Sequence, residues 1–143
     1  MTRFVDVETP YMANNEEQQR MHLLYARACV RDSLMRGETP FASHLFFTQP
    51  GILDDNLSNE RQMGIEAGKK LIEAIPGIVT VVYQDLGISK GMLYGIERAV
   101  TNRRGVEYRN LENGWKQREL EIARKHSHAT LWGFNHFQHL NPI

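Results

Sequence analysis

The chain has 143 residues, of which 41% are hydrophobic and 24% are charged, and its formal net charge is +0. This length is typical of one domain, and the composition predicts a packed soluble core. A balanced charge argues against a protein that binds nucleic acid through bulk electrostatics, because such proteins usually carry a basic surplus. No apolar run approaches the roughly 18 residues of a membrane span, and the start of the chain lacks the apolar stretch of a signal peptide. Cys29 is the single cysteine, so an intrachain disulfide is impossible and a reducing, cytoplasmic setting is expected.

The first quarter of the chain predicts a strand followed by a long helix. Residues 3–7 are rich in β-branched and aromatic residues, which is typical of a strand. Asn14 or Asn15 is expected to cap a helix that runs to about residue 36 and stops at Gly37. Cys29 lies within the apolar pattern of this helix, so we expect it to be a buried small hydrophobe.

The middle of the chain alternates in the same way. Residues 39–47 predict a second strand that ends near His44. Ser58 or Asn59 is expected to cap a helix over 60–74, whose spacing places four apolar side chains on one side: Met63, Ala67, Leu71 and Ala74. The nearly continuous β-branched run at 77–83 is typical of a strand buried on both faces of a parallel sheet. A helix to about residue 103 and a strand at 105–111 are expected to follow.

This alternation predicts an α/β fold: an open, mainly parallel sheet of four to five strands with helices on both faces, of the Rossmann or flavodoxin-like kind. Residues 1–111 are expected to form this domain, and residues 112–143 to add a C-terminal helix and an aromatic tail. In such sheets, ligands bind beyond the carboxyl ends of the strands. That rule selects four segments, 8–15, 43–50, 84–91 and 108–111.

The third of these segments, "QDLGISKG", joins the buried strand to a helix and has the features of an anion site. Free backbone N–H groups and a partial positive charge at a helix start favour a phosphate or carboxylate. Gly87 and Gly91 permit a close approach of the backbone, while Ser89 and Lys90 supply hydrogen-bond donors. A tight turn with a serine cap explains the same pattern equally well.

Three other side chains near these segments have both a functional and an ordinary interpretation. Glu97 lies about 10 Å beyond Lys90 along the helix axis, where a solvated or salt-bridged residue is the usual finding. His44 could contact a base or phosphate, or could simply be hydrogen-bonded at a strand end. Arg61 begins a helix near the proposed site and could pair with Glu97 or a loop carboxylate, although a plain surface ion pair explains it as well.

Several motifs together resemble those of the nucleoside 2-deoxyribosyltransferase-like family, which includes deoxynucleoside 5′-monophosphate N-glycosidases. Residues 83–100 carry its order of an Asp after the third strand, a Ser/Gly turn and a helix Glu, here Asp85, Ser89, Gly91 and Glu97. The "TPY" at 9–11 is similar to the turn after the family's first strand. The segments "PFASHLF" and "NERQMGIEAG" are similar to those of its uncharacterised phage relatives, and the resemblance spans about residues 4–110.

The resemblance implies an N-glycosidase or deoxyribosyltransferase that acts on a deoxynucleoside or its 5′-monophosphate. Glu97 would be the nucleophile that attacks the anomeric carbon, and Tyr11, next to Pro10, would orient it. Asp85 would contact the sugar hydroxyl or the base, and Ser89 with the helix start would hold a 5′-phosphate. A carboxylate nucleophile divides one difficult displacement into two easier steps. No cofactor is expected.

A second interpretation stays open, because the chain departs from the family's pattern. The helix before the third strand has Glu66 and Lys69 where many active members carry an Asp, and no glycine follows Tyr11. A nucleotide-binding protein without turnover, serving as a sensor or sponge for a signalling nucleotide, fits these residues too. A purely structural assembly protein is the third possibility.

The tail after residue 111 predicts an interaction surface rather than a metal site. The tail has four histidines: His126, His128, His136 and His139. No Cys and no acidic residue after Glu121 accompanies them, so no metal is expected. The aromatic residues of the tail suggest that it packs on another surface. The resemblance implies a site completed by a neighbouring subunit, and we therefore expect a homo-oligomer.

Overall fold

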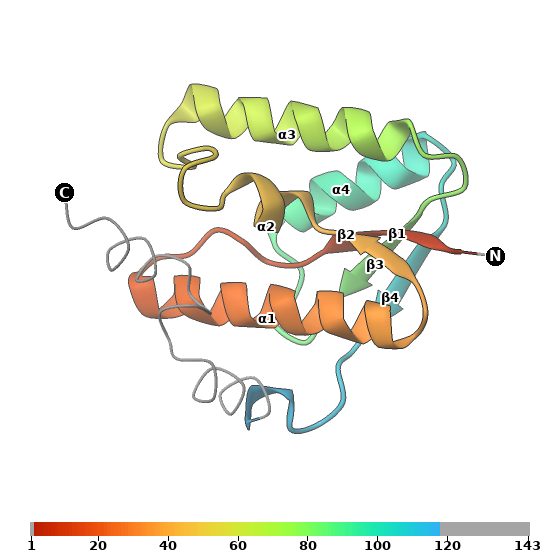
Figure 1. Ribbon diagram of the computed structural model, residues 1–143, viewed down its shortest axis with the longest axis horizontal. Helices are drawn as coiled ribbons and strands as arrows, with labels where there is room; N and C mark the ends of the chain where they lie inside the picture. The colour runs from red at the N-terminus through yellow and green to blue at the C-terminus, as the bar shows by residue number, and fades with distance from the viewer. Residues whose placement is uncertain (1, 118–143) are drawn as a thin grey trace.

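The structure, a computed structural model, describes residues 2–117, which form a four-stranded parallel sheet with helices on both faces (Figure 1). Four strands make up the sheet in the order β2-β1-β3-β4: β1 (Phe4–Glu8), β2 (Thr39–Phe41), β3 (Val79–Tyr83) and β4 (Val106–Arg109). The predicted fold class is confirmed. Because β2 and β3 lie on opposite sides of β1, the chain reverses its direction of growth between β1 and β3, which is the switch point where such sheets bind ligands.

The strands are connected by helices that lie on both sides of the sheet (Figure 1). Helix α1 (Glu16–Met35) covers one face, while α3 (Ser58–Glu73) and α4 (Lys90–Thr101) lie on the other, and the short α2 (Ser43–Phe47) leads from β2 toward α3. Asn15 caps α1 by accepting a hydrogen bond of 2.8 Å from the backbone N–H of Gln18. Gly37 follows the end of α1 with a φ of 83°, as the sequence predicts. Helix α3 has no side-chain cap, so the predicted cap is wrong there.

The main apolar core lies between α1 and the sheet. Val5, Val7 and Val81 point into it from β1 and β3, and Tyr25 and Cys29 enter it from α1. Cys29 is fully buried, as expected. Since side chains alternate along a strand, the remaining residues of β1 point toward the face covered by α3 and α4.

The predicted second strand is wrong beyond Phe41. The backbone N–H groups of Leu45 and Phe46 donate hydrogen bonds to the Ala42 carbonyl at 3.0 and 3.1 Å, and these bonds start α2. His44 therefore lies in the first turn of a helix rather than in a strand. A short apolar run cannot distinguish strand from helix by its period. The turn brings Ser43 so close to Gly68 of α3 that a Cβ on the glycine would lie 2.7 Å from the serine Cβ.

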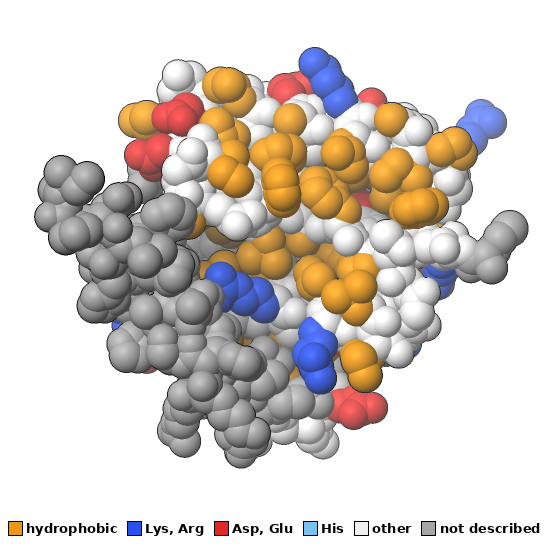
Figure 2. Space-filling view, viewed as in Figure 1, with side chains coloured by type: hydrophobic (Ala, Val, Ile, Leu, Met, Phe, Trp, Pro, Cys, Tyr) orange, Lys and Arg blue, Asp and Glu red, His pale blue; other side chains and the backbone are white. Residues whose placement is uncertain are grey.

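The side of helix α3 that packs against the rest of the protein differs from the apolar side that its sequence spacing predicts. All four residues of the predicted apolar side are exposed, Met63 and Leu71 to 59% and 41%, whereas Gly68 and Ile72 are buried. The prediction fails because glycine carries no apolar signal, yet it is the residue that allows α3 to approach α2. Hydrophobic side chains are consequently visible on the surface over α3 (Figure 2).

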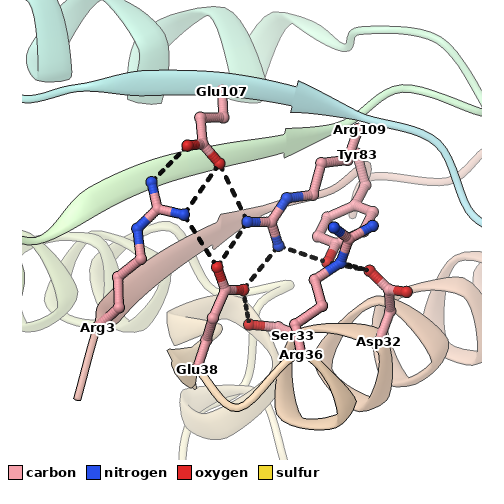
Figure 3. A network of polar contacts seen from close by, with 8 residues as sticks. All are labelled: Arg3, Asp32, Ser33, Arg36, Glu38, Tyr83, Glu107 and Arg109. Carbon is pink, nitrogen blue, oxygen red and sulfur yellow. Dashed lines mark hydrogen bonds and ion pairs between the residues drawn. The ribbon is translucent and has the colours of Figure 1, made fainter. Parts of the chain in front are cut away.

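A network of ion pairs joins the start of β2 to β4 (Figure 3). Arg109, whose side chain is 8% exposed, donates to both carboxylate oxygens of Glu38 at 2.7 and 2.6 Å. Arg3 and Glu107 extend the network, and the Tyr83 hydroxyl accepts a bond of 3.2 Å from Arg109. Two parallel N–H···O bonds between a guanidinium and a carboxylate are among the stronger hydrogen bonds, so this network has a structural role.

The expected C-terminal helix is described only as far as Gln117, and the tail histidines and aromatic residues lie outside the described residues. The role of the tail and the homo-oligomer therefore stay predictions. Within residues 2–117, no group of three or more His, Cys, Asp or Glu side chains is arranged to hold a metal ion. The same part of the chain has no helix that combines the length and the apolarity needed to cross a bilayer.

Candidate functional site

The carboxyl ends of the parallel strands meet at one edge of the sheet (Figure 1). Polar side chains from the loop after β1, from α2 and from α3 contact one another there. Just after β1, the Thr9 hydroxyl oxygen lies 2.7 Å from Nε2 of His44 on α2. The Tyr11 ring packs edge-on against the His44 ring, with centroids 5.8 Å apart. Arg61, in the first turn of α3, reaches the same loop and places Nη2 2.7 Å from Sδ of Met12. We call Thr9, Tyr11, His44 and Arg61 the Tyr11–His44 cluster.

Burial controls the protonation of the Tyr11–His44 cluster. It lowers the pKa of His44 to about 4, so the imidazole is neutral near pH 7 and has one donor and one acceptor nitrogen. Burial also raises the pKa of Tyr11, and a hydrogen bond with Thr48 and the positive charge of Arg61 oppose that rise. The cluster thus combines two neutral aromatic rings with one cation.

The loop after β3 ends in a capped helix start. The backbone N–H of Gly87, which has a φ of 89°, bonds to the Gln84 carbonyl at 2.9 Å and closes a turn. Ser89 caps α4, because its hydroxyl accepts a bond of 3.3 Å from the backbone N–H of the third helical residue. Lys90 and Gly91 are exposed. The serine cap is therefore present, and the first helical N–H groups stand beside a lysine at the same edge.

Asp85 is tied to the scaffold on the α1 side of this edge. Its carboxylate accepts hydrogen bonds from the Tyr25 hydroxyl at 2.5 Å and from the backbone N–H of Leu111 at 3.0 Å. These bonds hold the segment after β4 near α1, where the rings of Tyr25 and Trp115 pack with centroids 5.1 Å apart. A hollow of about 380 Å³ opens beside Asp85, lined by residues 111–117.

Glu97 lies apart from the other predicted catalytic residues. Its side chain is exposed in an open groove of about 300 Å³ between α3 and α4, where Lys69, Tyr94 and Arg98 are among its neighbours. Neither Tyr11 nor Asp85 lines this groove. The structure therefore gathers Tyr11, His44 and Arg61, but places Asp85 and Glu97 in two other surroundings.

Sequence reasoning missed a pair of carboxyl groups on the face covered by α3 and α4. Asp6 and Glu8 alternate with valines along β1, so both point away from the α1 core. Asp6 is buried and accepts a bond of 3.1 Å from the Thr80 hydroxyl. Glu8 is the last residue of β1, and its carboxylate packs directly on Gly95 of α4, where any side chain would overlap it. The combination of a charged strand end and a glycine in an apolar helix is the signal that could have revealed this contact.

The carboxyl groups of Asp6 and Glu8 differ in the groups that stabilise their charged forms. Burial raises the pKa of Asp6, which the Thr80 hydroxyl and the nearby arginines oppose. Burial and the charge of Asp6 hold the pKa of Glu8 well above its usual range, although Arg98 and Arg104 act in the opposite direction. No hydrogen bond from residues 2–117 reaches the Glu8 carboxylate. The Thr80 hydroxyl thus supports the charged form of Asp6, whereas burial disfavours the charged form of Glu8.

A family model described as a domain of unknown function, DUF7768, matches residues 3–109. The matched span runs from just before β1 to the last residue of β4, so it contains the whole sheet and the Tyr11–His44 cluster. No curated protein and no solved structure matches the chain.

Proposed function

We propose that this chain, which belongs to the DUF7768 family of domains of unknown function, binds a nucleotide or nucleoside at the carboxyl edge of its sheet without cleaving it. The observation that carries the proposal is the Tyr11–His44 cluster, in which three elements bring aromatic, neutral polar and cationic groups together. The cluster lies at the end of β1, beside the switch point where open parallel sheets bind ligands.

Each part of a nucleotide has a complementary group at this edge. The Tyr11 ring offers an aromatic surface for a base, and the neutral imidazole of His44 offers a hydrogen bond without a charge. The start of α4, with Ser89 and Lys90, favours a phosphate through its free N–H groups and its dipole. Arg61 adds a second cation near the ring pair.

The positions of the other carboxylates support binding without cleavage. Cleavage of a glycosidic bond uses two carboxyl groups that flank the same bond, about 5–10 Å apart. Asp85 is hydrogen-bonded to Tyr25 of α1, whereas Glu97 lies in the groove between α3 and α4. Helix α1 and the pair α3 and α4 cover opposite faces of the sheet (Figure 1). A ligand held by the Tyr11–His44 cluster would therefore not lie between them.

Titration calorimetry with a panel of nucleosides and nucleoside monophosphates tests the proposal. Loss of base stacking in Tyr11→Ala should weaken binding by about fivefold or more, since such stacking contributes about 1–3 kcal/mol per base. Tyr94→Ala is the matched control, because Tyr94 is an exposed tyrosine in the α3/α4 groove, and its affinity should equal that of the wild type. A panel without any binding, or a loss of affinity in Tyr94→Ala alone, would contradict the proposal.

Cleavage of the N-glycosidic bond is the second candidate, supported by the resemblance to the nucleoside 2-deoxyribosyltransferase-like family. The observation in its favour is that Glu97 stands in a groove of about 300 Å³ that could admit part of a small ligand. We expect no free base after incubation with deoxynucleosides and their monophosphates, followed by chromatography. Release of base that Glu97→Gln abolishes, while Glu73→Gln in the same groove leaves it unchanged, would establish the enzyme and overturn the binding-only proposal.

A further inference from the structure

We propose that two copies of this chain associate through a stripe of apolar side chains on α3, with the two helices antiparallel about a two-fold axis at Ala67. The stripe consists of Met63, Ala67, Leu71 and Ala74, and we call it the α3 stripe. The proposal goes beyond nucleotide binding and does not depend on it, because it concerns the side of α3 that faces solvent.

The α3 stripe has the spacing of a helix-packing surface. Its members are four, four and three residues apart, which places them on one face of a helix. All four are exposed in the described part of the chain, whereas α3 packs on the protein through the buried Gly68 and Ile72. Hydrophobic side chains accordingly run along α3 in the space-filling view (Figure 2). A contiguous exposed apolar surface of this kind is typical of a protein–protein interface.

The order of large and small side chains along the α3 stripe fits a second copy of itself. Ala67 lies between Met63 and Leu71, four residues from each. When two such helices run antiparallel about an axis at Ala67, the two alanines meet and allow a close approach of the helices. Met63 of one chain then lies beside Leu71 of the other, about 6 Å along the helix from the axis. The axis repeats this contact on its other side, so the stripe is self-complementary, as a two-fold interface requires.

The charges beside the α3 stripe are self-complementary in the same arrangement. Glu66 and Lys70 are exposed and lie about one turn apart on the same flank of the helix. A two-fold axis perpendicular to the helices keeps each flank on its own side. Glu66 of one chain therefore comes within about 3 Å, measured along the helix, of Lys70 of the other, and two intermolecular ion pairs result. The formal net charge of +0 adds no repulsion between whole chains.

The elements next to α3 favour association through helices. Ser43 and Phe47 of α2 lie against the glycines of α3, and Phe46 between them in the chain is 51% exposed, which enlarges the apolar surface. The edge strand β2 offers a poor surface for strand pairing, because it has only three residues and contains Pro40, which lacks a backbone N–H. A second α3 helix is therefore a better partner for this side of the molecule than a second strand.

Size-exclusion chromatography with light scattering on the full chain tests the proposal. The wild type should have twice the chain mass of 16.5 kDa at micromolar concentration. Ala67→Glu should have the mass of one chain, because it brings two carboxylates together at the axis. Val100→Glu is the matched control, since Val100 is a 64% exposed apolar residue on α4, and this variant should remain a dimer.

Sedimentation of two charge variants tests the contact between Glu66 and Lys70. Glu66→Lys and Lys70→Glu should each raise the dissociation constant of the dimer about tenfold, because two attractive pairs become repulsive. An equimolar mixture of the two variants should associate about as tightly as the wild type, since every lysine then faces a glutamate of the other chain. Circular dichroism shows that each variant is folded before its mass is compared.

A wild type with the mass of one chain would overturn the proposal. An Ala67→Glu variant that remains a dimer would do the same, because the interface would then lie elsewhere, such as at the C-terminal tail. Dissociation of Val100→Glu to the same extent would show that the loss is not specific to the α3 stripe. A mixture of Glu66→Lys and Lys70→Glu that associates no more tightly than either variant alone would contradict the antiparallel arrangement.

Discussion

Replacing Glu38 by Gln should destabilise the fold by about 2–3 kcal/mol at neutral pH. Glu38 receives two hydrogen bonds from Arg109, one of 2.8 Å from the Ser33 hydroxyl and an ion pair of 3.1 Å from Arg3. The bonds from Arg109 are the main reason that the pKa of Glu38 falls from 4.5 to about 2. At 1.36 kcal/mol per pH unit, this difference corresponds to about 3 kcal/mol. Solvent near the exposed Arg3 side chain screens part of that energy, which gives the lower end of the range.

The sign of the pH dependence follows from the lowered pKa. The contribution of Glu38 is complete above its unfolded pKa of 4.5 and is lost as pH falls toward 2. Urea denaturation should therefore show a gap of about 2–3 kcal/mol between wild type and Glu38→Gln at neutral pH that narrows in acid. Glu112→Gln, at an exposed position outside the network, is the control and should match the wild type. A neutral-pH gap below about 0.5 kcal/mol, the size of a surface effect, would refute the reasoning.

Two further predictions concern the close contact of α3 and the histidine of the candidate site. Gly68→Ala should lower the free energy of unfolding by about 1–3 kcal/mol, because the new methyl group would lie 2.7 Å from Cβ of Ser43. In the control Gly91→Ala, the new methyl group would lie no nearer than 4.0 Å to any atom, so the free energy of unfolding should stay unchanged or rise by up to about 1 kcal/mol. Equal losses of stability in the two variants would contradict the packing of α3 against Ser43. His44 should titrate near pH 4 in an NMR experiment, and its contribution to stability should be present above its ordinary pKa of 6.5 and decline as pH falls toward 4. A folded-state titration near 6.5 would show that this side chain is not buried as described.

The fold could be predicted from the sequence because its strongest signals are local. The β-branched run at 77–83 identified the buried β3, and Asn15 and Gly37 marked the ends of α1. Features that depend on contacts between helices and strands could not be predicted from the sequence. The packing side of α3 is set by Gly68 against Ser43, and a glycine adds nothing to an apolar pattern. The apolar run that begins at β2 likewise gave no sign that it becomes helical after Phe41.

The candidate site divides in the same way. The rule that ligands bind at strand ends selected Tyr11 and His44, and the structure places their rings in contact. The distance between Glu97 and that edge depends on which side of α4 faces the sheet, which the sequence pattern left open. Glu8 was missed because the predicted strand ends at residue 7, which leaves Glu8 in the loop that follows. In the structure, Glu8 is the last residue of β1 and its carboxylate packs against Gly95 of α4.

The central claim, that a nucleotide binds at the carboxyl edge, is tested most directly by mapping backbone amide NMR shifts of the ¹⁵N-labelled chain during titration with the tightest-binding member of the panel. We expect the largest changes in residues 8–12, at His44 and at residues 89–91, which surround the end of β1 and the start of α4. Changes confined to Lys69, Tyr94 and Glu97 would place the ligand in the α3/α4 groove and contradict the claim.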